Sequence, residues 1–302
     1  MKAIILAATA ALAVSLPAHA QLEAPAFAQV PYDETALSIP MTDGRGESLQ
    51  LAGKLCLPQG LNGKARLVVI NHGSPVDASA RRNMKLSGCG SEPAQWFLAR
   101  GFVVVFALRR GYGATGGAFA EDHGRCDNPD YIRAGLESAR DVEATVNYAT
   151  TLSQVRADGA VVAGVSAGGW ATLAYGAISH PRVVALIDFA GGRGGHHNNN
   201  PNSNCAPEAL ADAAGFYAKT ASTPMLWVYA ENDTFFRPRI AAALYKSYSD
   251  HGGKADFHAM PPFGDEGHYL WGAKGGSTVW GPLVDDYLKQ RGALGPDGKA
   301  SP

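Results

Sequence analysis

The chain has 302 residues, of which 46% are hydrophobic and 18% charged, and it carries a formal net charge of −1. This length and composition suit one large globular domain with a sizeable apolar core. So balanced a charge gives no electrostatic case for binding nucleic acid or an anionic membrane, and we expect neither as a partner.

The first twenty residues predict an export signal rather than part of the fold. A positively charged start, an apolar run of 14 residues (3–16) and the cleavage motif Ala18-His19-Ala20 follow one another. The run is too short to span a bilayer, and no later segment approaches the length of a membrane helix. We therefore expect residues 1–20 to be a signal peptide and residues 21–302 to form a single periplasmic or secreted domain without a membrane anchor. Residues 191–220 could form a small lid on this domain.

Strand and helix patterns alternate along the rest of the chain. The expected strands are 35–40 and 49–57, as an antiparallel lead-in, followed by 67–70, 102–107, 160–163, 183–190, 225–230 and 255–260. The expected helices are one that closes at 95–100, then 131–148, 170–174, 207–219, 237–248 and 278–289. This alternation predicts an α/β fold, a mostly parallel sheet of about eight strands with helices on both faces. The tail from Gly292 is expected to fray.

Four cysteines in an exported chain indicate one or two disulfides. Cys56 lies in the apolar stretch LAGKLCLP, which also suits a buried free thiol. The other three, Cys89, Cys126 and Cys205, lie in loops rich in glycine and asparagine, where a bridge would pin the loops around a pocket. Their spacing does not resemble a zinc site, and the pairing stays open.

The segment DGAVVAGVSAGGWATLAY, residues 158–175, is the strongest functional signal. An apolar strand runs into Gly-x-Ser-x-Gly and then into a helix, which is the pattern of a nucleophile elbow with Ser166 as nucleophile. Glycines at 164 and 168 would let the turn close, and the helix N-terminus would favour an oxyanion. A plain glycine turn is the alternative, and the flanking strand and helix argue against it.

Such a serine needs a base and an acid that orients it. After the strand at 225–230 comes Glu231-Asn232-Asp233, in which we take Asp233 as the acid and Glu231 as the fallback, a structural loop aspartate being the alternative. After the last strand, His268 completes the chain order Ser, Asp, His in a glycine-bounded loop. The rival histidine, His258, falls inside the strand.

Two backbone amides should bind the oxyanion of the tetrahedral intermediate. One belongs to Ala167, the residue after the nucleophile, and the other is expected from Ser74 in the loop after the strand at 67–70. Gly73 would let this loop approach a substrate carbonyl closely. His72 is expected to be a structural loop histidine.

Further polar residues invite either a functional or a structural interpretation. In Gly191 to Asn204, His196 and His197 could contact substrate, bind a metal, or belong to a solvated lid, and the lid is favoured. Arg109 and Arg110 could anchor a substrate carboxylate, but pairing with an acid such as Asp141 is favoured. Trp170 is expected to pack in the core behind the nucleophile.

Together, these motifs resemble the α/β-hydrolase superfamily. They are NHGS, RRGYGATGG, GVSAGG, AENDTF and GDEGH, spread over nearly the whole mature chain. The sequence looks most like bacterial dienelactone-hydrolase-like and prolyl-oligopeptidase-like serine hydrolases. The founding dienelactone hydrolases use a cysteine nucleophile, whereas Ser166 stands here, so the resemblance favours ordinary ester hydrolysis.

The implied mechanism is two-step acyl transfer on a small-molecule carboxylic ester. We expect no metal or organic cofactor. An exopeptidase or amidase with the same triad is the nearest alternative. A non-catalytic binding member of the fold is a third, and the intact set of triad residue types argues against it.

Overall fold

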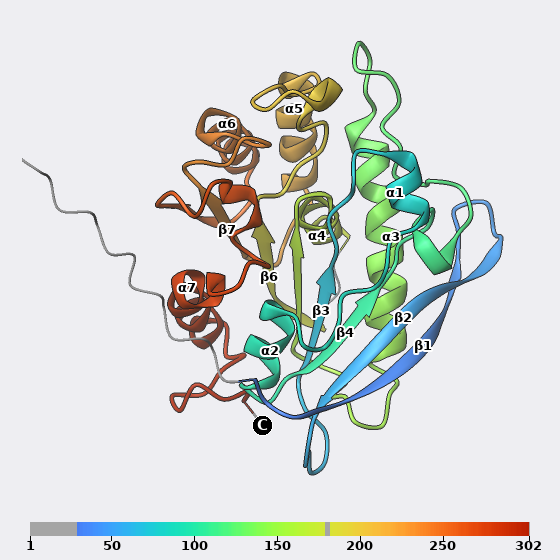
Figure 1. The fold of residues 1–302 in the computed structure, drawn as a ribbon, viewed down its shortest axis with the longest axis vertical. Helices are drawn as coiled ribbons and strands as arrows, with labels where there is room; N and C mark the ends of the chain where they lie inside the picture. The colour runs from blue at the N-terminus through green and yellow to red at the C-terminus, as the bar shows by residue number, and fades with distance from the viewer. Residues whose placement is uncertain (1–28, 179–181, 302) are drawn as a thin grey trace, which may run out of the picture.

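The computed structural model describes residues 29–178 and 182–301 (Figure 1). The predicted signal peptide lies outside this described part of the chain. Eight strands form one sheet in the order β1-β2-β4-β3-β5-β6-β7-β8. The strands are β1 Tyr32–Thr42, β2 Ser48–Pro58, β3 Leu67–Asn71, β4 Val103–Ala107, β5 Ala160–Val165, β6 Val183–Phe189, β7 Met225–Ala230 and β8 Ala255–Met260.

The strand directions confirm a mostly parallel sheet. The hairpin of β1 and β2 joins β4 in antiparallel fashion, and every pairing from β4 across to β8 is parallel. In the centre, Val69 of β3 lies opposite Val105 of β4 and Val162 of β5. All residues of β3 and β4 are buried, as their continuous β-branched runs predict.

Helices cover both faces of the sheet (Figure 1). They are α1 Ala78–Arg82, α2 Glu92–Leu98, α3 Tyr131–Ala149, α4 Ala167–Gly176, α5 Pro207–Ala218, α6 Pro238–Asp250 and α7 Gly276–Gln290. One core cluster joins the sheet to α3, α4, α5 and α6 and includes Trp170 and Tyr217. The other joins the sheet to α2 and α7 through Trp96 and Trp280. Burying each such ring stabilises the fold by roughly 2–3 kcal/mol.

Sequence patterns predicted most element bounds and missed two features. Helix α1 was not expected; it begins where the Asp77 carboxylate accepts a hydrogen bond from the Ala80 amide at 2.8 Å. The prediction that the tail frays was wrong. Ala293 and Leu294 are buried, and the Ala300 amide donates to the Arg100 carbonyl at 2.7 Å, just before β4 begins.

Two disulfides account for all four cysteines. Cys56 of β2 is bonded to Cys89, with Cα atoms 5.7 Å apart, so it is not a free thiol. Cys126 is bonded to Cys205, with Cα atoms 5.2 Å apart. Both bonds are typical of an oxidising, extracellular environment. Among the helices of the described residues, none combines the length and the apolar character that crossing a membrane requires.

Candidate active site

Ser166 lies on the sharp turn between β5 and α4, with φ 56° and ψ −123°. A positive φ is costly for a residue with a side chain, so the surrounding packing must hold it. Two glycines make the turn possible. A Cβ at Gly164 would lie 2.2 Å from the Gly168 carbonyl oxygen, and one at Gly168 would lie 2.3 Å from the Asn71 carbonyl oxygen. The sequence therefore folds here as the elbow pattern predicts.

Backbone hydrogen bonds fix this turn on both sides. The Ser166 amide donates to the Phe189 carbonyl of β6 at 2.9 Å. Its carbonyl accepts from the Trp170 amide at 2.9 Å and from the Gly192 amide at 3.2 Å. The loop after β3 passes close by, since a Cβ at Gly73 would lie 3.3 Å from the Ser166 Cβ.

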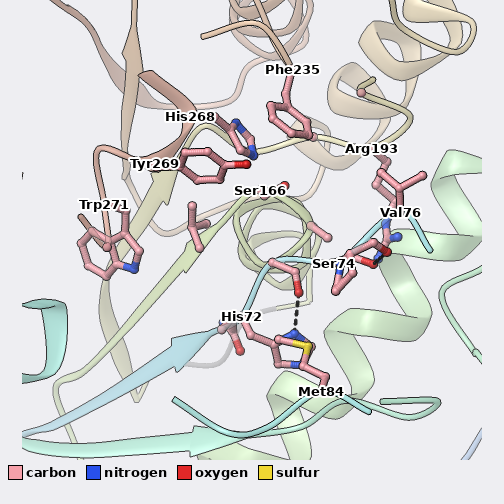
Figure 2. A pocket seen from close by; sticks show the side chains of 18 of the residues that line it. His72, Ser74, Val76, Met84, Ser166, Arg193, Phe235, His268, Tyr269 and Trp271 are labelled. Atoms are coloured by element: carbon pink, nitrogen blue, oxygen red, sulfur yellow. Dashed lines mark hydrogen bonds between the residues drawn. The ribbon is translucent and has the colours of Figure 1, made fainter. Parts of the chain in front are cut away.

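The loops after β7 and β8 bring a histidine and a carboxylate together. His268 Nδ1 lies 2.9 Å from Asp233 Oδ2, and both side chains are buried. The other carboxylate oxygen of Asp233 accepts the amides of Phe235 and Phe236 at 2.7 and 2.8 Å. Asp233 is thus held by three hydrogen bonds. The bond to Nδ1 leaves Nε2 of His268 free to face the pocket that Ser166 also lines (Figure 2).

Neither alternative residue belongs to this buried pair. Glu231 lies two residues before Asp233 in the loop after β7, but it is exposed to solvent. His258 lies inside β8, where its Nε2 is 3.1 Å from Asp256 Oδ1, and it does not line the pocket.

Sequence reasoning missed Glu266, which joins the two loops that carry Asp233 and His268. Its Oε1 accepts the amides of His268 and Thr234, each at 3.0 Å, and its Oε2 accepts the Thr234 hydroxyl. The only sequence signal was an acidic residue two positions before His268, which does not reveal a partner in another loop.

The rings of His196, Phe235 and His268 form one stack. Phe235 stacks on His268 with centroids 4.2 Å apart, and His196 stacks on the other side of Phe235 at 3.4 Å. His196 Nε2 also lies 2.8 Å from the Thr234 hydroxyl oxygen. His196 therefore supports the ring that covers His268.

The neighbouring His197 lies elsewhere, in a group with Cys126 and Cys205 whose potential ligand atoms fall within 4.8 Å of one another. Because the two sulfurs are joined in a disulfide, they offer no thiolate to a metal ion.

A buried ionic cluster lies beneath the loop after β3. Arg109 binds Glu121 through Nε and Nη2 at 2.8 and 3.1 Å, and its Nη1 donates to the His72 carbonyl at 2.8 Å. Glu121 also accepts the Tyr112 hydroxyl and faces Arg193 Nη2 at 2.6 Å. Burial alone would raise the pKa of Glu121, but the charges of Arg109 and Arg193 hold it well below its usual range.

His72 is a structural residue of this cluster, as expected. Burial, helped by the charge of Arg109, lowers the pKa of His72 to about 3, so the ring is neutral. The Arg109 amide donates to Nε2 at 3.1 Å, which places the proton on Nδ1, 2.7 Å from the Gly73 carbonyl oxygen. This tautomer fixes the backbone immediately before Ser74.

Arg110 has the partner that the sequence suggested. Its Nε lies 2.6 Å from Asp141 Oδ1, its amide donates to Asp141 Oδ2 at 2.8 Å, and Glu137 takes Nη2 at 2.9 Å. Arg109 instead binds Glu121. Neither arginine lines the pocket. Trp170 packs edge-on against Tyr131 and Tyr217 in the core, as expected.

These loops enclose a pocket of about 810 Å³ at the carboxyl end of the sheet (Figure 2). Ser166 and His268 line it together with Gly73, Ser74 and Ala167, the residues of the two expected oxyanion loops. The rest of the wall is mainly apolar and aromatic, and includes Phe106, Phe119, Phe235, Phe236 and Trp271.

The sequence model of the prolyl oligopeptidase family matches residues 91–280, which is well over half of the chain. The chain belongs to this family. Among the described residues, the match spans β4 to β8 and includes Ser166, Asp233 and His268. A comparison with curated proteins gives no match.

Solved structures of hydrolases share the fold. An acylaminoacyl peptidase of Pyrococcus horikoshii has 17% identity and a TM-score of 0.60, covering 85% of this chain and 41% of its own. An esterase of Pyrococcus furiosus has 14% identity and a TM-score of 0.56, covering 86% and 93%. A dienelactone-hydrolase-like protein of Klebsiella pneumoniae has 13% identity and a TM-score of 0.56, covering 86% and 98%. This chain thus spans about two fifths of the peptidase.

The family match supports a hydrolase, and the solved structures show that the chain has the α/β-hydrolase fold. At such identities the structures speak for the fold alone, so the substrate must be argued from the pocket.

Proposed function

We propose that the protein is an exported serine esterase that cleaves carboxylic esters by way of an acyl-enzyme. The observation that carries this proposal is the buried His268–Asp233 pair, 2.9 Å apart, whose histidine lines one pocket with Ser166 on its strained turn. A nucleophile, a base and an orienting carboxylate are the minimum set for acyl transfer.

In the first step, the Ser166 hydroxyl attacks the ester carbonyl and gives its proton to Nε2 of His268. The hydrogen bond from Nδ1–H to Asp233 keeps the ring in the required tautomer and stabilises the imidazolium that forms. The protonated ring then gives its proton to the leaving alcohol. Water repeats the attack on the acyl-enzyme and releases the acid.

The amides of Ala167 and Ser74 are proposed to bind the oxyanion. Ala167 begins α4, so its amide has no partner within the helix and can point at developing charge. Ser74 follows Gly73, which passes within contact distance of Ser166. Each such donor stabilises the transition state by about 3 kcal/mol.

The test combines a fluorophosphonate probe with turnover of p-nitrophenyl acetate and butyrate. Wild type should be labelled on the peptide that contains Ser166, and Ser166→Ala and His268→Ala should lose both labelling and turnover. His258→Ala is the matched histidine control and should keep both, because His258 lies outside the pocket. A folded wild type that neither labels nor turns over would exclude the proposed mechanism.

A peptidase or amidase is the second candidate, because the chain belongs to the prolyl oligopeptidase family. The same residues would serve, since both reactions pass through an acyl-enzyme. Aminoacyl p-nitroanilides and the matching p-nitrophenyl esters separate the two. Faster cleavage of the anilides, measured as kcat/KM, would favour the peptidase.

Export is proposed from the charged start, apolar run and cleavage motif of residues 1–20, and the two disulfides support it. N-terminal sequencing of protein from the periplasmic and culture fractions should begin at Gln21. A cytoplasmic protein that starts at Met1 would contradict this.

A further inference from the structure

Arg193 is buried but lines the pocket. It follows β6, and only 6% of its surface is exposed. Within the described part of the chain, its Nε and Nη2 donate no well-aligned hydrogen bond, although Nη2 lies 2.6 Å from Glu121 Oε1 as an ion pair. A buried guanidinium with unsatisfied donors is costly unless something else accepts from it.

Glu121 cannot accept hydrogen bonds from all the donors of Arg193, because its carboxylate oxygens already accept others. Both of its oxygens are bound by Arg109, and Oε1 takes the Tyr112 hydroxyl as well. One carboxylate therefore faces two guanidinium groups. The other acids of this region are Asp141, which is bound to Arg110, and Glu137, which is shared between Arg110 and Arg140. The site beside Arg193 thus has one positive charge in excess.

The charges of the pocket wall point the same way. Two arginines, Arg81 and Arg193, line the pocket, and no aspartate or glutamate does so among the described residues. Arg81 is already engaged: its Nη1 donates to the carbonyls of Pro75 and Val76, and its guanidinium lies 4.3 Å from the Phe119 ring centroid. Arg193 is the arginine of this wall whose donors are buried without well-aligned acceptors in the described residues.

Arg193 also lies close to the nucleophile. The preceding residue, Gly192, donates its amide to the Ser166 carbonyl at 3.2 Å. In Figure 2, Arg193 and Val76 lie on one side of Ser166, and Trp271 lies on the opposite side. A substrate whose carbonyl carbon is at Ser166 can therefore extend a short arm toward Arg193.

We propose that Arg193 forms an anion subsite and that the preferred substrates are esters carrying a free carboxylate. This inference rests on the proposed esterase function. The carboxylate would pair with the Arg193 guanidinium from the pocket side and balance the excess charge. Hydrogen bonds between two charged groups are about twice as strong as neutral ones, so the subsite would select for substrate charge as well as for size.

The test compares esters that match in shape and differ in charge. For a carboxylate on the acyl side, the pair is mono-p-nitrophenyl glutarate and p-nitrophenyl valerate. For one on the alcohol side, it is 4-carboxyphenyl acetate and 4-carbamoylphenyl acetate. Wild type should favour the charged member of one pair in kcat/KM. Arg193→Gln should reduce that preference about tenfold or more, and Arg193→Lys should reduce it less.

Arg81→Gln is the matched control from the same wall and should keep the preference. If Arg81→Gln reduces the preference as much as Arg193→Gln does, the general potential of the pocket is responsible and the subsite is wrong. Equal preference in wild type and Arg193→Gln, for both pairs, would also overturn it. Thermal melts establish that each variant folds, and Arg193→Lys, which keeps the charge, carries the test if Arg193→Gln does not fold.

Binding of glutarate to Ser166→Ala, measured by calorimetry, separates this inference from the proposed function. Binding that is at least tenfold weaker in Ser166→Ala/Arg193→Gln supports the subsite, even if wild type proves to have no esterase activity. Absent or equal binding in both variants contradicts the subsite, even if Ser166 is labelled by the fluorophosphonate.

Discussion

Asp233 and Glu231 are two acidic residues in one loop with opposite environments. Asp233 is buried and bound by His268 Nδ1 and by two amides, whereas Glu231 is exposed. Asp233→Asn should keep the packing but no longer hold the catalytic tautomer of the histidine, so kcat for p-nitrophenyl butyrate should fall by about 10⁴-fold. Glu231→Gln is the control and should stay within twofold of wild type. A similar loss in both variants would show that Asp233 has no special role.

Asp188, at the end of β6, predicts a pH dependence of stability. Burial raises its pKa to about 8, and its Oδ1 has no hydrogen-bond partner in the described residues. Because the folded state holds a proton that the unfolded state releases near pH 4, the contribution of Asp188 to stability is lost as the pH rises toward 8. In Asp188→Asn this loss is absent.

Chemical denaturation at pH 7 and pH 8 measures the effect. The free energy of unfolding of Asp188→Asn, relative to wild type, should increase by about 1 kcal/mol between these two pH values. Asp212→Asn, on the exposed surface of α5, is the matched control. A constant difference between Asp188→Asn and wild type would mean that Asp188 is ionised throughout this range.

Within α4, alanine substitutions at two glycines should change the free energy of unfolding by very different amounts. A Cβ at Gly168 would lie 2.3 Å from the backbone oxygen of Asn71, whereas a Cβ at Gly176 would meet only side-chain ends, those of Leu186 at 3.0 Å and Met225 at 3.6 Å. Gly168→Ala should lower the free energy of unfolding by about 2–3 kcal/mol, because backbone atoms must move. Gly176→Ala should change it by less than about 1 kcal/mol, since alanine favours the helix. Equal effects in urea titrations would contradict this packing.

The bounds of helices and strands were predicted well where apolar patterning and turn residues agreed. Strand β7 has the expected bounds because the apolar run MLWVYA is followed by Glu231-Asn232-Asp233, and β8 has them because glycines precede it and prolines follow it. The elbow pattern and the chain order also singled out Ser166, Asp233 and His268 as candidate site residues. Glu266, Arg193 and the Arg109–Glu121 pair could not, because each depends on how separate loops pack.

The disulfides stabilise the whole molecule. Cys126 and Cys205 are 79 residues apart, and Cys56 and Cys89 are 33 apart. Replacing either pair by serine should lower the free energy of unfolding by about 3–4 kcal/mol, with the larger loss for the longer loop. Thermal melts with and without reductant measure it. In each double-serine variant, reductant should remove only the stabilisation that the other disulfide provides. A melting temperature of wild type that does not change under reductant would contradict the prediction.

The position of the tail from Gly292 onward determines where the protein can be immobilised or fused without blocking the pocket. Ala300 pairs with Arg100 at the amino end of the parallel strands, whereas Ser166 and His268 lie at the carboxyl end. In Figure 1 the C-terminus accordingly lies at the bottom, below α2. A resin, a reporter domain or a second enzyme coupled there would leave the mouth of the pocket facing outward, whereas attachment through the loops after β6 or β8 would obstruct it.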